Sequence, residues 1–155
     1  DGSFTQMDKN KSLSMHLFSF GSEAPGYASY LLDENREDAF TYLAKTAHDE
    51  WAYSMLETPD TILKASITSF NLTEVPIRWY SLKHSDVARL VLTTDGIAQL
   101  VDEKQDKVPW QEACKALITF KNDKGQFLAR KSDRILEDFK AKAYDDFSAI
   151  GLIFE

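Results

Sequence analysis

A histidine stands directly beside acidic residues at one place in the sequence, His48-Asp49-Glu50. A histidine with neighbouring carboxylates can act as a general base or supply metal ligands, provided that the groups converge on one cleft. Adjacent helical residues point in different directions, so such a site needs His16 or His84 from elsewhere in the fold. No two histidines have the i,i+4 spacing of a helical zinc site. We therefore expect no metal and no cofactor. An enzyme built on His48, Asp49 and either His16 or His84 stays a hypothesis, and we favour a protein that is not an enzyme.

The single cysteine, Cys114, excludes an intrachain disulfide and a cysteine-based zinc site. Cys114 lies on an expected helix over residues 109–116, on the same stripe as Trp110 and Leu117, which indicates a buried, inert thiol. The loop over residues 21–26 contains no Lys or Arg, and its Glu23 would repel a phosphate, so we interpret it as an ordinary turn.

The acidic residues are concentrated at the start of the chain. The net charge is −7, and residues 1–60 hold eleven acidic and four basic residues, whereas residues 109–155 hold eight of each. Acidic faces steer small inhibitor and immunity-type proteins onto basic partners. The preferred hypothesis is therefore a small acidic interaction module whose helix over residues 36–57 binds a basic protein through Glu37, Asp38, Asp49 and Glu50. A plain solvated helix is the competing interpretation.

Aromatic residues suggest a second hypothesis, because they make up 12% of the chain. A small-molecule site could lie between the sheet and the first helix, although aromatic residues also simply fill cores. The lining residues would be Phe18, Phe20, Tyr27, Tyr30, His48 and Trp51.

The same charge balance argues against nucleic acid and membranes. Phosphates must be neutralised by Lys and Arg, and a net-acidic chain is a poor candidate for that. Basic residues do occur at Arg130, Lys131 and Arg134, but the helix over residues 109–116, where a DNA reader would concentrate them, offers only Lys115. No apolar run is long enough to cross a bilayer. With its single thiol, the chain is expected to be cytoplasmic.

Periodic apolar residues predict the elements that must position these groups. Strands are expected over residues 13–20, 62–72, 75–82 and 149–154, because these runs are rich in β-branched, aromatic and other apolar residues. A helix is expected over residues 36–56 from its apolar stripe, and another from Ser132, with Ile135, Phe139, Ala143 and Phe147 on its stripe.

Two segments are harder to interpret. Residues 85–105 fit a helix broken at Gly96, which we favour, but also a hairpin between residues 89–92 and 97–101. Residues 117–120 and 126–129 flank Asn122-Asp123-Lys124-Gly125, which predicts a second hairpin. The sequence thus predicts an α+β fold, with an antiparallel or mixed sheet of about four to six strands packed against two longer helices.

The chain shows no internal boundary. Residues 7–155 are expected to form a single domain, and Met7 resembles a natural start, so we interpret residues 1–6 as a cloning remnant and leave them out of the functional reasoning. A homodimer is possible through an edge strand such as residues 75–82.

Overall fold

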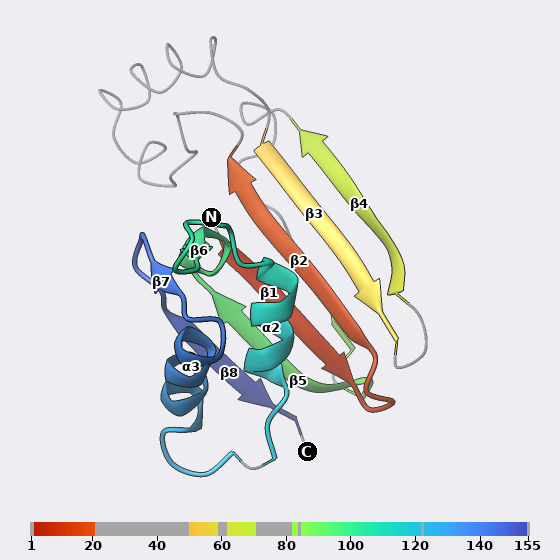
Figure 1. The fold of residues 1–155 in the computed structure, drawn as a ribbon. Helices are drawn as coiled ribbons and strands as arrows, with labels where there is room; N and C mark the ends of the chain where they lie inside the picture. The colour runs from red at the N-terminus through yellow and green to blue at the C-terminus, as the bar shows by residue number, and fades with distance from the viewer. Residues whose placement is uncertain are drawn as a thin grey trace, which may run out of the picture.

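The computed structural model describes residues 2–20, 50–58, 62–70, 82–83, 85–121 and 123–154 (Figure 1). Six strands in this part of the chain form one sheet in the order β4-β3-β2-β1-β5-β8, and every neighbouring pair is antiparallel. The strands are β1 (Gly2–Asp8), β2 (Leu13–Phe20), β3 (Glu50–Glu57), β4 (Ile62–Phe70), β5 (Val87–Thr93) and β8 (Ala149–Ile153).

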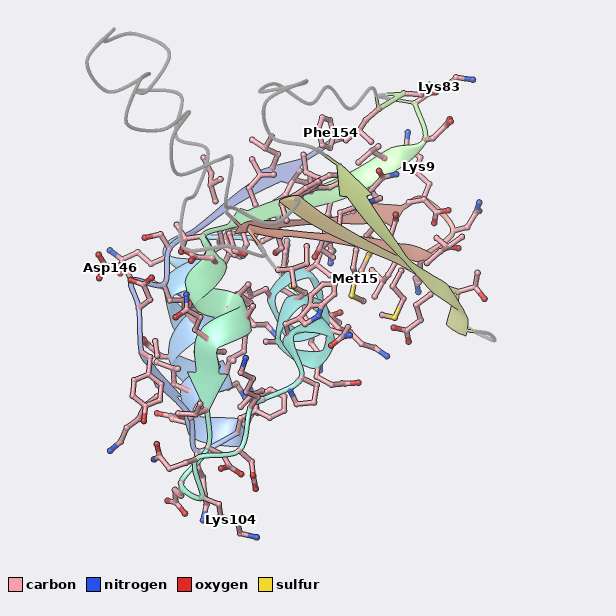
Figure 2. All side chains as sticks on the ribbon, turned by 90° about the horizontal axis from the view of Figure 1, so that it is seen from above. Lys9, Met15, Lys83, Lys104, Asp146 and Phe154 are labelled. Atoms are coloured by element: carbon pink, nitrogen blue, oxygen red, sulfur yellow. The ribbon has the colours of Figure 1, made fainter. Side chains whose placement is uncertain are left out.

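Two helices lie on one face of this sheet, α2 (Trp110–Ile118) and α3 (Phe127–Asp138) (Figures 1 and 2). A 3-10 helix, η2 (Asp95–Gln99), follows β5, and a small second ladder pairs β6 (Leu100–Val101) with β7 (Lys142–Ala143). The predicted α+β single domain is therefore confirmed, with 9 residues in α2 and 12 in α3.

The core lies between the two helices and the sheet. Met15 reaches it from β2, and Figure 2 shows this side chain on the helix side of the sheet. The helices present the apolar stripe that amphipathic helices turn toward a core. The buried cluster comprises Leu13, Met15, Val91, Ile97, Leu100, Val108, Ala113, Cys114, Leu117, Ile118, Ile135 and Ala141.

The strand β1 lies in the middle of the sheet, between β2 and β5. Its residues Ser3, Phe4 and Thr5 are all buried. The fold therefore begins before Met7, the expected start of the domain, because residues 2–6 supply most of a central strand. Their interpretation as a cloning remnant stays a prediction.

The expected helix over residues 36–56 is wrong where it can be compared with the structure. Residues 36–49 lie outside the described residues, and Glu50–Glu57 is the strand β3, paired with β2 and β4. Trp51 and Met55 are four residues apart, a spacing that places two residues on the same side of either a helix or a strand. Pairing with strands on both sides decides for the strand.

The helix favoured over residues 85–105 is also wrong. Val87–Thr93 is the strand β5, as the hairpin alternative implied for residues 89–92, but β5 pairs with β1 and β8 rather than with residues 97–101. Leu90 and Val91, on opposite faces of β5, are both buried. A central strand covered on both faces has a continuous apolar run, which imitates a helical stripe.

The second predicted hairpin is wrong as well. Helix α2 continues through Ile118, and α3 begins at Phe127, so the turn joins two helices. Ser132 therefore lies inside α3, whereas Ala143 lies in β7 and Phe147 precedes β8. The strands expected over residues 13–20, 62–72 and 149–154 are confirmed as β2, β4 and β8 within the described residues, with β4 ending at Phe70 and β8 at Ile153. The edge strand expected over residues 75–82 lies outside the described residues except for Leu82, which is not in a strand.

Candidate functional site

Most residues of the sequence hypotheses lie outside the part of the chain that the structure describes. These are Glu37, Asp38, Asp49, Tyr27, Tyr30, His48 and His84. Glu50 is the first residue of β3, paired in register with Phe20 on β2 and Phe70 on β4. Trp51 follows it, opposite Ser19. Glu50 is thus placed in a strand, not on a helical face.

His16 and Phe18 lie on the sheet face opposite the helices. The His16 ring stacks on Phe4 with 4.2 Å between ring centroids, and the Phe18 ring also stacks on Phe4, with 5.9 Å between centroids. The Nε2 atom of His16 is 2.9 Å from the Ser14 hydroxyl. Burial lowers the pKa of His16 below its ordinary 6.5, because a charged imidazole loses hydration there. His16 is packed as a neutral ring among aromatic neighbours.

Cys114 lies on the face of α2 that is buried in the core. Its Sγ atom lies 3.4 Å from the Ser3 hydroxyl, which in turn lies 2.7 Å from the Thr93 hydroxyl. Burial raises the pKa of the Cys114 thiol, so the thiol stays protonated at neutral pH. The predicted buried thiol is confirmed.

Carboxylates from distant parts of the sequence meet where β5 ends. The amide of Gln99 donates to Asp95 Oδ2 at 3.0 Å and to Asp145 Oδ2 at 3.4 Å. The Thr94 hydroxyl donates to the carbonyl of Asp146 at 2.7 Å and accepts from the Ser148 amide at 3.0 Å. Carboxylates are ligands for hard divalent cations. Within the described residues, however, no group of three or more His, Cys, Asp or Glu side chains could hold a metal ion.

A cationic pocket that the sequence analysis did not predict opens beside α3. We call it the α3 pocket. It has a volume of about 570 Å³, within the range typical of small-molecule sites. Its lining residues are Thr119, Phe120, Lys121, Phe127, Arg130, Lys131 and Arg134.

One wall of the α3 pocket is the segment that follows α2. The guanidinium of Arg89 on β5 lies 4.1 Å from the centroid of the Phe120 ring. It also donates hydrogen bonds to the carbonyl oxygens of Ile118 at 3.3 Å and Phe120 at 3.0 Å. A planar guanidinium can stack and donate at the same time, which lysine cannot do. Arg89 therefore fixes the end of α2 and the Phe120 ring on the sheet.

The other wall is a single face of α3. Phe127, Arg130, Lys131 and Arg134 follow the i, i+3, i+4, i+7 pattern that places residues on one side of a helix. The Phe127 ring packs against Phe120, with ring centroids 4.5 Å apart. Phe127 and Leu128 also rest on Gly151 of β8, where a Cβ atom would lie 3.0 Å from Leu128 Cδ1. Gly151 thus lets α3 approach the sheet closely.

The charges of the α3 pocket are mostly uncompensated. Among the described residues, its lining includes four cationic side chains and no carboxylate. Arg134 pairs with Asp138 at 3.5 Å, but both side chains are exposed and such pairs contribute only about 0–1 kcal/mol. Arg130 donates to the carbonyl oxygen of Lys124 at 2.9 Å, which orients the guanidinium without neutralising it. The pocket can therefore attract an anion and donate hydrogen bonds to it.

The basic residues of α3 are visible in the sequence, where their only interpretation was as basic residues after an expected hairpin in a DNA-binding domain. The signal that could have found the pocket is their helical spacing beside Phe127. No family model, curated protein or solved structure matches this chain. No described helix is long and apolar enough to cross a membrane.

Proposed function

We propose that this chain is a binding module that holds a small anionic organic ligand in the α3 pocket. The observation that carries the proposal is a cavity of about 570 Å³ lined by four cationic side chains and no carboxylate. Residues 109–155 contain eight basic residues, and half of them line this one pocket. Such a concentration of one charge in a concave site raises the local concentration of oppositely charged ligands.

The overall charge favours a small ligand over a polymer. At physiological ionic strength, charges are screened over about 8 Å, so a small anion inside the pocket interacts mainly with the lining residues. A nucleic acid would extend beyond the pocket, over the surface of a protein whose net charge is −7. Repulsion over that length opposes the neutralisation that nucleic-acid binding requires. We accordingly retain the prediction that the partner is not a nucleic acid.

This proposal belongs to the small-molecule hypothesis drawn from the sequence, but it uses different residues. The hypothesis preferred from the sequence, a basic protein partner, depends on Glu37, Asp38 and Asp49, which lie outside the described residues. It also depends on Glu50, which was expected in a helix and lies in the strand β3. It stays a prediction, as does the enzyme hypothesis. The lining of the α3 pocket, by contrast, lies among the described residues.

Inorganic pyrophosphate is a suitable first probe, because it carries several negative charges and no organic group. We expect isothermal titration calorimetry to detect binding that weakens as NaCl is raised from 50 to 300 mM. The variant Arg130→Gln/Arg134→Gln should bind at least about tenfold more weakly. Each lost hydrogen bond to a charged group is worth about 1.5–3 kcal/mol before screening, and tenfold corresponds to about 1.4 kcal/mol.

The matched control removes two positive charges elsewhere. Lys104 and Lys142 are exposed and absent from the pocket lining, and Figure 2 shows Lys104 at the tip of a loop remote from the sheet. Lys104→Gln/Lys142→Gln should retain pyrophosphate affinity within about twofold, because neither lysine lines the pocket and salt screens charges over about 8 Å. Equal losses in both variants, or no binding of either pyrophosphate or an organic phosphate, would refute the proposed function.

A further inference from the structure

The floor of the α3 pocket is aromatic, whereas its rim is cationic. Phe120 is only 8% exposed, and Phe127 is partly buried beside it. Lys121, Arg130 and Arg134 are exposed around them. A simple inorganic anion would use the rim and leave the aromatic floor uncovered. The division of the lining therefore points to a ligand with an apolar part as well as a charged one.

The aromatic floor is held in place before any ligand binds. Arg89 covers one face of Phe120, and the tilted Phe127 ring packs on Phe120 and contacts Gly151 only through its Cζ atom, 3.6 Å from where a Gly151 Cβ would lie. A ring already fixed by its neighbours loses little conformational entropy when a second ring packs on it. Planar aromatic groups are the natural partners of such a surface, since offset stacking adds to the burial of area.

The cationic rim is suited to phosphate. Arginine forks pair bidentately with phosphate oxygens, and four cations favour a ligand with two or more negative charges over a single carboxylate. Arg130 and Arg134 follow Phe127 by three and seven residues, which is about 4.5 and 10.5 Å along the helix axis. A ligand that spans both features carries its phosphate one to two helical turns from its ring.

We infer that the α3 pocket takes a phosphorylated compound with a planar aromatic ring, of the nucleoside diphosphate class. The ring lies against Phe127, and the phosphates contact Arg130, Arg134 and the lysines of the two walls. This inference rests on the proposed function, because it assumes that the pocket binds anions. It adds that the aromatic floor of the pocket contributes to the affinity for the ligand and favours anions that carry an aromatic ring.

Three probes separate the two parts of the ligand: adenosine 5′-diphosphate, inorganic pyrophosphate and adenosine, each titrated without Mg²⁺. We expect the diphosphate nucleotide to bind at least about fivefold more tightly than pyrophosphate, since stacking a base on an aromatic side chain contributes a factor of about 5 to 150. Adenosine alone should bind more weakly than either. This comparison uses the unaltered chain and does not depend on any variant folding.

A variant of Phe127 then tests whether the aromatic floor of the pocket causes the tighter binding of the nucleotide. Phe127→Leu keeps an apolar side chain but removes the ring, so the nucleotide should lose its advantage while pyrophosphate affinity stays within about twofold. Tyr144→Leu is the matched control, because Tyr144 is 70% exposed and does not line the pocket. Far-UV circular dichroism and the melting temperature confirm that both variants are folded.

The outcomes distinguish the inference from the proposed function. Equal affinities for the nucleotide and pyrophosphate would overturn the aromatic-ring inference and leave the proposed function intact. Adenosine binding as tightly as the nucleotide would overturn the role given to phosphate. Absence of binding by all three probes would overturn both. A nucleotide advantage that persists in Phe127→Leu would show that the ring lies elsewhere, against the inference.

Discussion

Gly96 offers a direct test of how tightly the segment after β5 is packed against the segment before β8. It lies in the 3-10 helix η2 and is buried. A Cβ atom at this position would lie 2.6 Å from the carbonyl oxygen of Asp146, 3.0 Å from its carbonyl carbon and 3.1 Å from Phe147 Cα. All three atoms belong to the backbone, so no side-chain rotation can relieve the clash in Gly96→Ala.

The magnitude follows from two opposing effects. Overpacking a closed site costs about 1–3 kcal/mol, and a clash with backbone belongs at the upper end of that range. Replacing glycine by alanine also stiffens the unfolded chain, which returns about 0.4–1 kcal/mol because the φ of Gly96 is not positive. The free energy of unfolding should therefore fall by about 2 kcal/mol. For a chain of this size, that lowers the melting temperature by about 4–8 °C.

The measurement is a pair of urea and thermal unfolding curves, with Gly151→Ala as the matched control. At Gly151 the nearest atom, 3.0 Å away, is Leu128 Cδ1, the end of a side chain that can rotate. Gly151→Ala should therefore cost less than about 1 kcal/mol. If Gly96→Ala is as stable as the unaltered chain, or if both variants lose the same stability, the backbone packing described at this junction is refuted.

Two further predictions concern titratable groups. Because burial lowers the pKa of His16, the unfolded chain takes up a proton more readily, and stability should fall as the pH drops below 6.5 through the folded pKa. His16→Phe, which can keep the stack on Phe4, should lose less stability than the unaltered chain between pH 7.5 and pH 5.0 in urea unfolding, and an unchanged pH dependence would contradict this cause. Because Cys114 is buried and its thiol pKa is raised, a water-soluble thiol reagent should modify it at least about a hundredfold more slowly in the folded chain than in concentrated urea. Comparable rates in the two conditions would show that the core under α2 opens readily.

The sequence predicted the fold class because several strands carry an unambiguous pattern. The run over residues 13–20 is apolar on both faces, and the runs over residues 62–70 and 149–153 are rich in β-branched and other apolar residues. Errors occurred where one pattern fits two structures. Trp51 and Met55 satisfy a helical stripe and a strand face alike, and the continuous apolar run of β5 imitates a helix.

The α3 pocket could be predicted only in part. The helical spacing of Phe127, Arg130 and Arg134 is present in the sequence, but the hairpin expected at residues 126–129 concealed it. The opposite wall depends on a contact between Arg89 and Phe120, which are 31 residues apart. Nothing local in the sequence indicates that β5 clamps the end of α2. Tertiary contacts of this kind assemble most binding sites, and the periodicity of apolar residues along the sequence does not predict them.

The position of β1 in the sheet has a consequence for how the chain acquires its structure during synthesis. Its residue Ser3 pairs with Thr93, 90 residues later, and the far side of β5 is completed only by β8, near residue 150. Closing a loop of that length costs about 4 kcal/mol plus a constant, and folding rates fall as such distant contacts dominate. While the ribosome is still adding α2 and α3, the apolar side of β1 and β2 around Met15 has no cover. The nascent chain is therefore most exposed to aggregation until residues 110–153, which supply α2, α3 and β8, have emerged.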